Sequence, residues 1–465
     1  MNRILSFSCM RPFIFFFSIG LFLTGCSTGG QHKKKSDSCA LKKEGQVIPL
    51  ISGIQVIRFV FENGLRLLVV ENRSSPTFAY QSWFRVGSRD EEPGRTGLAH
   101  LFEHMMFKET KNLKDGEFDR LLESAGAQGE NAFTSRDYTA YIQELPQDQL
   151  ELIVRAESDR MHHLVINQHA FETEREVVQN ERRFRTENSP DGLMNQELFE
   201  LAFTKHPYHW PIIGYEKDLN QMNSEDARLF YLKHYSPNHA TIVVVGDVCA
   251  SQVYSLAQKY YGTLPPQNFT PSNPLNEPIQ TNPRKKQLKL NIQVEKLLVA
   301  YPIPAFTHPD IPALQVLRSL VGLGKSSRLN QALIETGVAS SVDLSELDDK
   351  DPSLLIIAVD LQHQKRATQA ESIILKEFDR LAKNSVSQHE LERAKNKINF
   401  DTYSGLGSNF QLAQFLGSLE SIAGDFVVGM RQIEKIQSVT AQEVQAVAQR
   451  YLNLKGRTVI IGVPK

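Results

Sequence analysis

Two histidines one helical turn apart are the residues of this chain best placed to do chemistry. Residues 98–105 read LAHLFEHM, with apolar residues at positions 98, 101, 102 and 105. That spacing predicts one buried face of an α-helix. His100 and His104 then lie on another face, with Glu103 beside them. Two imidazoles placed in this way can converge on a single metal ion.

A third, oxygen ligand would complete a site of two histidines and one carboxylate, with a position open for water. Bound zinc lowers the pKa of such a water to about 7, and Glu103 is placed to accept its proton. The pattern HxxEH is the inverse of HExxH and marks the inverzincins. Taken alone it is a short pattern, which a surface helix carrying two unrelated histidines would also produce.

The residues on both sides extend the pattern. Residues 84–91 read FRVGSRDE, and residues 97–108 read GLAHLFEHMMFK. These segments closely resemble the signature of the pitrilysin/insulinase family, which includes the mitochondrial processing peptidases and half-length bacterial peptidases. The resemblance implies a zinc metalloendopeptidase in which His100 and His104 bind zinc and Glu103 is catalytic.

The third ligand implied by the resemblance follows on a second helix. Residues 174–181 read EREVVQNE, which resembles the family pattern of two glutamates on either side of a valine. Glu181 would complete a site for one zinc ion per chain. Glu174 shares its helix face but stands about 10 Å away along the axis, so one ion cannot bind both directly. By the family pattern Glu174 supports catalysis by orienting a ligand imidazole; the alternative is an exposed helix charge.

A further match concerns the substrate. Residues 131–139 read NAFTSRDYT and resemble the active-site edge strand of the family. By that resemblance Asn131 and Ala132 bind the backbone of a peptide that adds to the sheet as an extra strand. The alternative is an asparagine in a turn. His206 and His209 lie in another family-like segment, and we predict structural roles for them.

The mature chain divides into two similar halves. Residues 264–283 contain six prolines, which predicts an interdomain linker. A helix followed by a buried strand ends each half, with Gly246 and Gly462 at equivalent positions, 216 residues apart. We therefore predict an N-terminal zinc-binding peptidase domain at 47–263 and a homologous C-terminal domain at 284–465.

Each half mixes strands and helices. Residues 59–70 read FVFENGLRLLVV, two apolar runs around Asn63-Gly64, which predicts a β-hairpin. Most of the chain from 97 to 236 reads as helix, and there is no regular βαβ alternation. These patterns predict an α+β fold with two homologous domains, each a largely antiparallel sheet with helices packed on one face. Ser224 and Thr440 are predicted to cap the matching helices.

The N-terminus predicts export and lipidation. Residues 12–23 form an apolar run after Arg3 and Arg11, and this run is shorter than the ~20 residues of a membrane-spanning helix. The next residues complete LTGC, which resembles a bacterial lipobox. We expect a lipoprotein signal peptide at 1–25, a lipid on Cys26, and a flexible tether at 26–46. An ordinary signal peptide with an unrelated cysteine is the alternative. Ser27 favours an outer-membrane anchor facing the periplasm of a Gram-negative bacterium.

Composition excludes several classes of protein. The 465 residues include 52 Lys and Arg against 53 Asp and Glu, a net charge of −1. This balance argues against a nucleic-acid-binding protein, and 41% hydrophobic residues exclude a disordered chain. One apolar run excludes a polytopic membrane protein. The four cysteines form no CxxC pair, and the state of Cys39 and Cys249 stays open.

The second half departs from the family. Catalytic family members carry an Arg and a Tyr in a segment like REXGLAY, where this chain has IETGVAS with Ile334 and Ser340. We therefore expect a zinc-dependent endopeptidase of peptides or unfolded polypeptides, in the periplasm, that pairs with a second half-length family member supplying Arg and Tyr. A homodimer, a non-catalytic peptide-binding or assembly subunit, and a lipid-anchored scaffold without metal are the alternatives.

Overall fold

The computed structural model describes residues 45–267 and 276–465, and its strands form two separate sheets. The first sheet has seven strands in the order β1-β2-β3-β7-β4-β6-β5. Their bounds are β1 (Gln46–Pro49), β2 (Gln55–Val60), β3 (Arg66–Glu71), β4 (Thr77–Phe84), β5 (Gln128–Thr134), β6 (Thr139–Pro146) and β7 (Ala240–Gly246). Only β3 and β7 pair in parallel within it, so the sheet is largely antiparallel.

The second sheet repeats this topology. Its order is β10-β11-β9-β12-β8, and β8 and β12 are its parallel pair. The strands are β8 (Arg284–Leu290), β9 (Lys296–Ile303), β10 (Ala339–Leu344), β11 (Ser353–Leu361) and β12 (Thr458–Pro464). Written in reverse, the order of the second sheet is β8-β12-β9-β11-β10. This order corresponds strand by strand to β3-β7-β4-β6-β5 of the first sheet. Gly246 and Gly462 lie on the equivalent strands β7 and β12, as the sequence repeat predicts.

Helices fill most of the remaining chain. In the first half they are α1 (Leu98–Met105), α2 (Glu117–Ser124), α3 (Leu150–His163), α4 (Gln168–Arg182), α5 (Pro190–Ala202), α6 (Glu216–Gln221), α7 (Ser224–His234) and α8 (Ala250–Tyr261). In the second half they are α9 (Ile311–Gly322), α10 (Ala367–Lys383), α11 (Gln388–Ser404), α12 (Asn409–Ala423), α13 (Phe426–Lys435) and α14 (Ala441–Tyr451). No helix within the described ranges combines the length and apolarity needed to cross a bilayer.

Local signals in the sequence predicted a few element ends. The Asn63-Gly64 turn joins antiparallel β2 and β3, and Gly64 has a φ of +83°. Thr440 caps α14 by accepting a hydrogen bond from the Glu443 amide. The prediction that Ser224 is a cap is wrong: Asn223 caps α7 instead, because its longer side chain accepts from the amides of residues 225 and 226.

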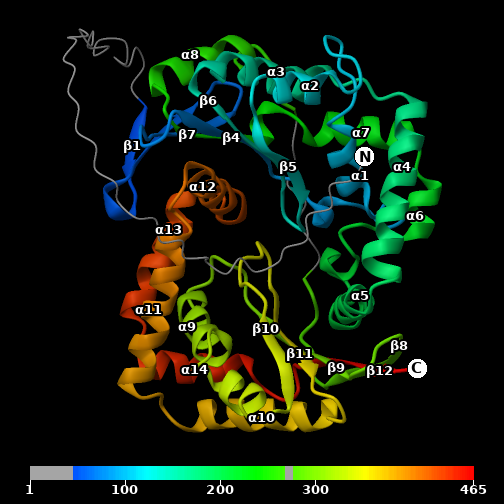
Figure 1. Ribbon diagram of the computed structural model, residues 1–465, viewed down its shortest axis with the longest axis vertical. Helices are drawn as coiled ribbons and strands as arrows, with labels where there is room; N and C mark the ends of the chain where they lie inside the picture. The colour runs from blue at the N-terminus through cyan, green and yellow to red at the C-terminus, as the bar shows by residue number, and fades with distance from the viewer. Residues whose placement is uncertain (1–44, 268–275) are drawn as a thin grey trace, which may run out of the picture. The chain divides into compact units, whose positions relative to one another are not determined.

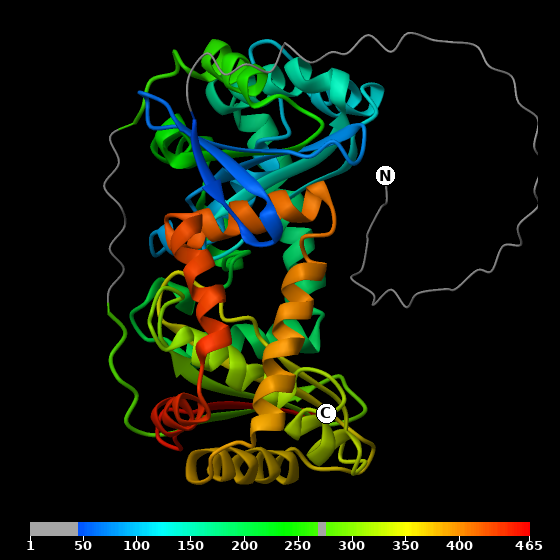
Figure 2. The same cartoon turned by 90° about the vertical axis from the view of Figure 1, so that its left-hand side faces the viewer.

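The two faces of the first sheet have different partners. Alternate residues such as Leu67 and Tyr80 pack with helices of the same half, including α1, α3, α7 and α8. The opposite face is covered by α12, which comes from the second half (Figures 1 and 2). There Leu412 and Leu416 join one apolar cluster with Trp83, and burying a leucine fully contributes roughly 1.5–3 kcal/mol.

The exchange of helices is reciprocal. The first-half helix α5 packs on the second sheet, where Met194 and Leu198 contact a cluster that includes Ile460. Both contacts rely on a glycine. A Cβ on Gly417 of α12 would lie 2.2 Å from the Trp83 ring, and one on Gly462 would lie 2.8 Å from the Met194 sulfur.

The predicted domain boundaries remain a prediction, because each half lends a helix to the other. The strands of the first sheet end at residue 246 and those of the second begin at 284. The predicted signal peptide 1–25, Cys26 and nearly all of the 26–46 tether lie outside the described residues, as does Cys39.

Candidate metal centre

Helix α1 carries the histidine motif, and its position is fixed at both its apolar face and its first turn. Leu98, Leu101 and Met105 are buried against the helices and sheet of the first half. Glu91, itself buried, accepts hydrogen bonds from the amides of Gly97 (3.0 Å) and Ala99 (2.8 Å). A carboxyl group at a helix N-terminus accepts hydrogen bonds from the free amides and interacts favourably with the helix dipole.

Helix α4 packs against α1 and carries the two predicted glutamates. Its N-cap Asn167 accepts from the amide of Ala170, and Phe171 and Val178 are buried. A π-helical turn, η4 (Arg183–Glu187), continues α4 directly. Such turns occur often at functional sites.

The structure brings His100, His104 and Glu181 together, with one donor atom from each within 4.8 Å of the others. Glu181 Oε2 lies 3.7 Å from His100 Nε2 and 3.4 Å from His104 Nε2. The two rings stand on successive turns of α1 with centroids 5.0 Å apart. Two imidazoles and one carboxylate form the ligand set of catalytic zinc sites, so the donors present fit a zinc ion.

Glu174 lies behind His104 rather than among these donors. Its Oε2 is 3.3 Å from His104 Nδ1, and its Oε1 is 2.7 Å from Lys108 Nζ. A hydrogen bond at Nδ1 fixes the imidazole tautomer and directs Nε2 toward Glu181. Lys108 therefore holds Glu174, and sequence reasoning did not single out this lysine.

Burial and ion pairing shift the pKa values of the two histidines in opposite directions. Burial lowers the pKa of His100 to about 4, and the charge of His104 acts in the same direction. Burial also opposes protonation of His104, but contacts with Glu174 and Glu181 outweigh it and raise the pKa to about 9. Near pH 7 His100 is thus neutral, which is the form that binds a metal, whereas His104 carries a proton that a binding metal would displace.

Glu103 is buried beside the three donors and is not one of them. Thr134 donates a hydrogen bond to Glu103 Oε2 at 2.5 Å. Burial raises the pKa of Glu103 to about 7, although the hydrogen bond from Thr134 acts against the shift. A carboxylate with this pKa can both accept and return a proton near neutral pH.

Strand β5 places Asn131 and Ala132 at an open edge. Among the described strands it pairs only with β6, and it is the last strand of the first sheet. Asn131 is exposed, whereas Ala132 packs toward the first-half core. An edge strand presents unpaired amides and carbonyls to which an extended peptide can add. Thr134 belongs to the same strand, so β5 is linked directly to Glu103.

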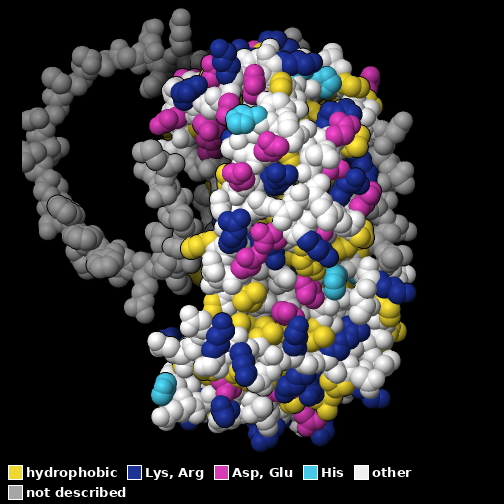
Figure 3. All heavy atoms as spheres, turned by 90° about the vertical axis from the view of Figure 1, so that its right-hand side faces the viewer, with side chains coloured by type: hydrophobic (Ala, Val, Ile, Leu, Met, Phe, Trp, Pro, Cys, Tyr) yellow, Lys and Arg dark blue, Asp and Glu magenta, His cyan; other side chains and the backbone are white. Residues whose placement is uncertain are grey.

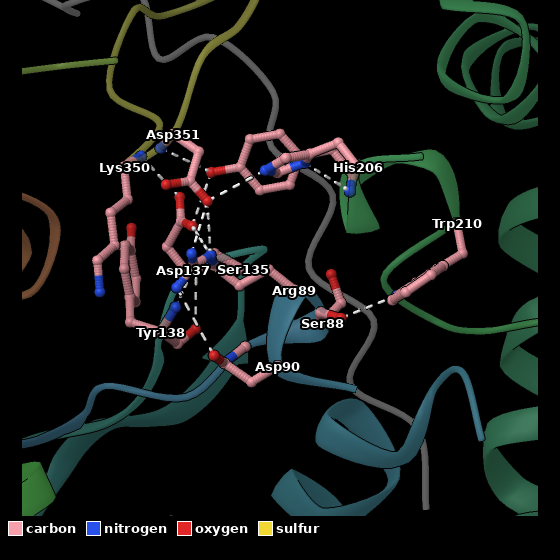
Figure 4. Close-up of polar contacts among 12 residues, drawn as sticks. Ser88, Arg89, Asp90, Ser135, Asp137, Tyr138, His206, Trp210, Lys350 and Asp351 are labelled. Atoms are coloured by element: carbon pink, nitrogen blue, oxygen red, sulfur yellow. Dashed lines mark hydrogen bonds and ion pairs between the residues drawn. The ribbon is translucent and has the colours of Figure 1, made fainter. Parts of the chain in front are cut away.

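A buried polar junction, which the sequence did not reveal, joins the end of β5 to the second half (Figure 4). Arg89 Nη2 lies 2.7 Å from Asp351 Oδ2, and His206 Nε2 lies 3.2 Å from the same oxygen. Asp137 accepts hydrogen bonds from the Tyr208 hydroxyl and from the amide of residue 350. His206 belongs to this junction, in line with its predicted structural role. Arg89 and Asp351 are 262 residues apart, so no local pattern could have paired them.

The two positions that depart from the family lie in the second half. Ile334 ends the π-helical turn η7 (Asn330–Ile334) and packs against the apolar cluster there. Ser340 is exposed on β10, and its hydroxyl donates to the carbonyl of Asp360. Neither side chain offers a charge or a phenol.

Comparison with known proteins agrees with this geometry. Residues 66–215 match the family model described as insulinase (peptidase family M16), and residues 221–398 match the model described as the peptidase M16 inactive domain. The zinc protease PqqE of Helicobacter pylori is 34% identical over 372 residues, which cover 79% of this chain and 81% of that protein. This chain belongs to the M16 peptidase family.

Other similar proteins extend the comparison. An uncharacterized zinc protease of Streptomyces coelicolor is 24% identical and aligns over 95% of this chain and 97% of its own length. The crystal structure of a protease from Helicobacter pylori superimposes with a TM-score of 0.84 at 29% identity, covering 88% of this chain and all of that one. The periplasmic protease PqqL of Escherichia coli shares the fold, with a TM-score of 0.74 at 20% identity over 90% of this chain and 48% of that one.

Replacement of Glu174 tests its support of His104. We expect Glu174→Gln to weaken zinc binding about 10–100-fold, because an amide cannot replace a carboxylate between Lys108 and the imidazole. Zinc affinity is measured by competition with a chromogenic chelator. Glu176→Gln, an exposed position on the same helix, is the matched control. Equal zinc affinities for both variants would contradict the assignment.

Proposed function

We propose that this protein is a zinc-dependent endopeptidase that hydrolyses peptides or unfolded polypeptides. The observation that carries the proposal is the convergence of His100, His104 and Glu181 with Glu103 buried beside them. A zinc ion held by these three donors would act as a Lewis acid toward the scissile carbonyl and the attacking water. The cluster would hold one zinc ion per chain.

The protein's own residues supply the remaining steps. A substrate strand adds to β5, where Asn131 and Ala132 lie, and this fixes the scissile bond over α1. Glu103 accepts a proton from the attacking water and passes it to the leaving amine. The hydrogen bond from Thr134 keeps the Glu103 carboxylate oriented, and because Thr134 is part of β5 it links substrate binding to the base.

Glu103→Gln separates metal binding from catalysis. We expect it to retain zinc, because Glu103 is not one of the three donors, and to lose hydrolysis by at least about 10²-fold. Zinc content by mass spectrometry and turnover of a fluorogenic peptide are measured on the same sample. Glu123→Gln, on an exposed part of α2, serves as the control. Unchanged turnover in Glu103→Gln would remove this residue from the role of base.

The composition of the active assembly is a second part of the proposal. The family Arg and Tyr are replaced here by Ile334 and Ser340, and loss of an oxyanion donor typically costs about 10²–10³-fold in rate. A second half-length family member supplying both residues would restore them, so the protein would be the zinc-bearing subunit of a heterodimer. A homodimer would leave both positions unfilled.

We expect the purified chain alone to cleave unfolded peptides at least about 10²-fold more slowly than the chain co-expressed with a half-length M16 partner from the same genome. Size-exclusion chromatography with light scattering identifies the complex. Full zinc-dependent turnover by the isolated chain would refute the heterodimer. A chain that binds zinc and peptides but hydrolyses nothing, with or without the partner, would instead be a peptide-binding or assembly subunit, the alternative that Ile334 and Ser340 leave open.

We also propose that Cys26 carries a lipid that anchors the protein to the outer membrane, facing the periplasm. The support is the LTGC segment after the apolar run at 12–23. Cys26→Ser should then move the protein from the membrane fraction to the soluble periplasmic fraction of fractionated cells. Retention of Cys26→Ser in the membrane, or absence of radiolabelled palmitate from the wild-type protein, would contradict the anchor.

A further inference from the structure

Three arginines follow the predicted ligand Glu181 closely, and the structure gives each a different environment. Arg182 is buried, where it donates to the Gly214 carbonyl and to Gln196. Arg183 is exposed and bonds to Asn180 one turn back. Arg185 alone of the three turns to the metal centre, with its Nη1 2.9 Å from Glu181 Oε1.

One edge of the Arg185 guanidinium pairs with Glu181, and the rest of the side chain is exposed to solvent. Glu181 is only 17% exposed, whereas the Arg185 side chain is 70% exposed. A guanidinium has five N–H donors in a planar fork, and a single carboxylate oxygen engages only part of them. The remaining N–H donors of Arg185 therefore face solvent, beside Glu181, which is one of the three metal donors.

Neighbouring side chains on this part of the molecule are also exposed. Phe184 is 67% exposed and Val177 is 44% exposed, at helical spacings of three and four residues from Glu181. The face of the molecule that carries α4, α5 and α6 shows basic and acidic side chains interspersed (Figure 3). Exposed apolar residues and an open guanidinium beside the site provide surface for a bound peptide.

The arrangement of α1 shows how a substrate would reach Arg185. Helix α1 contacts β5 on one side and α4 on the other (Figure 1). In the proposed function a peptide that adds to β5 crosses α1, and α4, which η4 continues, packs against α1. Side chains of alternate substrate residues point away from the sheet plane, and those next to the scissile bond are the ones placed to approach the turn that bears Arg185.

We propose that Arg185 is a specificity-determining residue that binds an acidic side chain of the substrate next to the scissile bond. The fork geometry matches a carboxylate, and the ion pair with Glu181 holds the fork in place before substrate arrives. This inference rests on the proposed peptidase function and names a preferred substrate class: peptides with Asp or Glu beside the cleaved bond.

The test compares matched peptides. The cleavage site in a neutral parent peptide is mapped by mass spectrometry. Peptides with Gln or Glu at each of the two positions on either side of the cleaved bond are then compared. For the wild-type protein we expect kcat/KM to rise about three- to fivefold for Glu over Gln at one position at least, the range of a partly exposed ion pair. Arg185→Gln should remove this preference, so that the ratio of kcat/KM for Glu over Gln falls to about one, and Arg185→Lys should retain part of the preference. Arg183→Gln, the matched control, should leave it unchanged.

A second readout does not depend on turnover. The same peptides are titrated against zinc-loaded Glu103→Gln protein with and without Arg185→Gln, and the Glu-to-Gln ratio of dissociation constants should follow the kinetic ratio. Zinc content is measured for every variant. An unchanged ratio in Arg185→Gln, an equal loss for acidic and neutral peptides, or a loss explained by missing zinc would each overturn the proposal. Failure of the wild-type protein, assayed together with its half-length M16 partner, to cleave the parent peptide would instead refute the peptidase function, while the binding ratio would still report on Arg185.

Discussion

The packing of α1 against α4 is the contact on which the candidate site depends. Two histidines one turn apart on a single helix can direct their imidazoles to one point, but they supply only two ligands. The third donor, Glu181, comes from α4, so the site exists only if two helices separated by more than 60 residues meet in one register. The apolar face of α1, the cap from Glu91, and the contact of Glu174 with both His104 and Lys108 all serve that register.

The same constraint extends to the substrate strand. Thr134 of β5 donates to Glu103 of α1, so the edge of the first sheet and the base of the reaction are coupled by one hydrogen bond. Asp137 lies in the turn after β5, where it pairs with Arg89 and accepts a hydrogen bond from the amide of Lys350. Arg89 also pairs with Asp351, so this turn is fixed against the second half. A buried charged group is costly unless it is paired. Here Arg89 and His206 both pair with Asp351 across the two halves, and Asp137 pairs with Arg89 within the first half. The second half thus supports the site although it contributes none of the three metal donors.

Several features of the fold were predictable because their causes are local. The hairpin at Asn63-Gly64 and the cap at Thr440 follow from turn chemistry and capping chemistry. The repeat of a helix and a strand at an offset of 216 residues predicted two similar halves. The cap predicted at Ser224 was displaced by one residue because Asn223 competes for the same amides. The predicted layer of helices on one face of each sheet is present, but α12 and α5 also cover a face of the sheet in the opposite half. Apolar periodicity shows that a helix face is buried without showing which sheet covers it.

The sequence by itself determined the identities and spacings that matter within single elements: the imidazoles on α1 and the glutamates at positions 174 and 181 on α4. The edge strand that becomes β5 was expected from resemblance to a family. Resemblance to a family supplied the link between the two helices. Only the tertiary structure decided which charges support these residues. Lys108 behind Glu174 and Asp351 beside Arg89 are pairs chosen by packing, since side chains on different elements meet only after the backbone has been placed. Arg185 and Glu181, in contrast, are four residues apart on one continuous helical stretch. A sequence records the period of each element, whereas the meeting of distant side chains depends on how buried surfaces fit together.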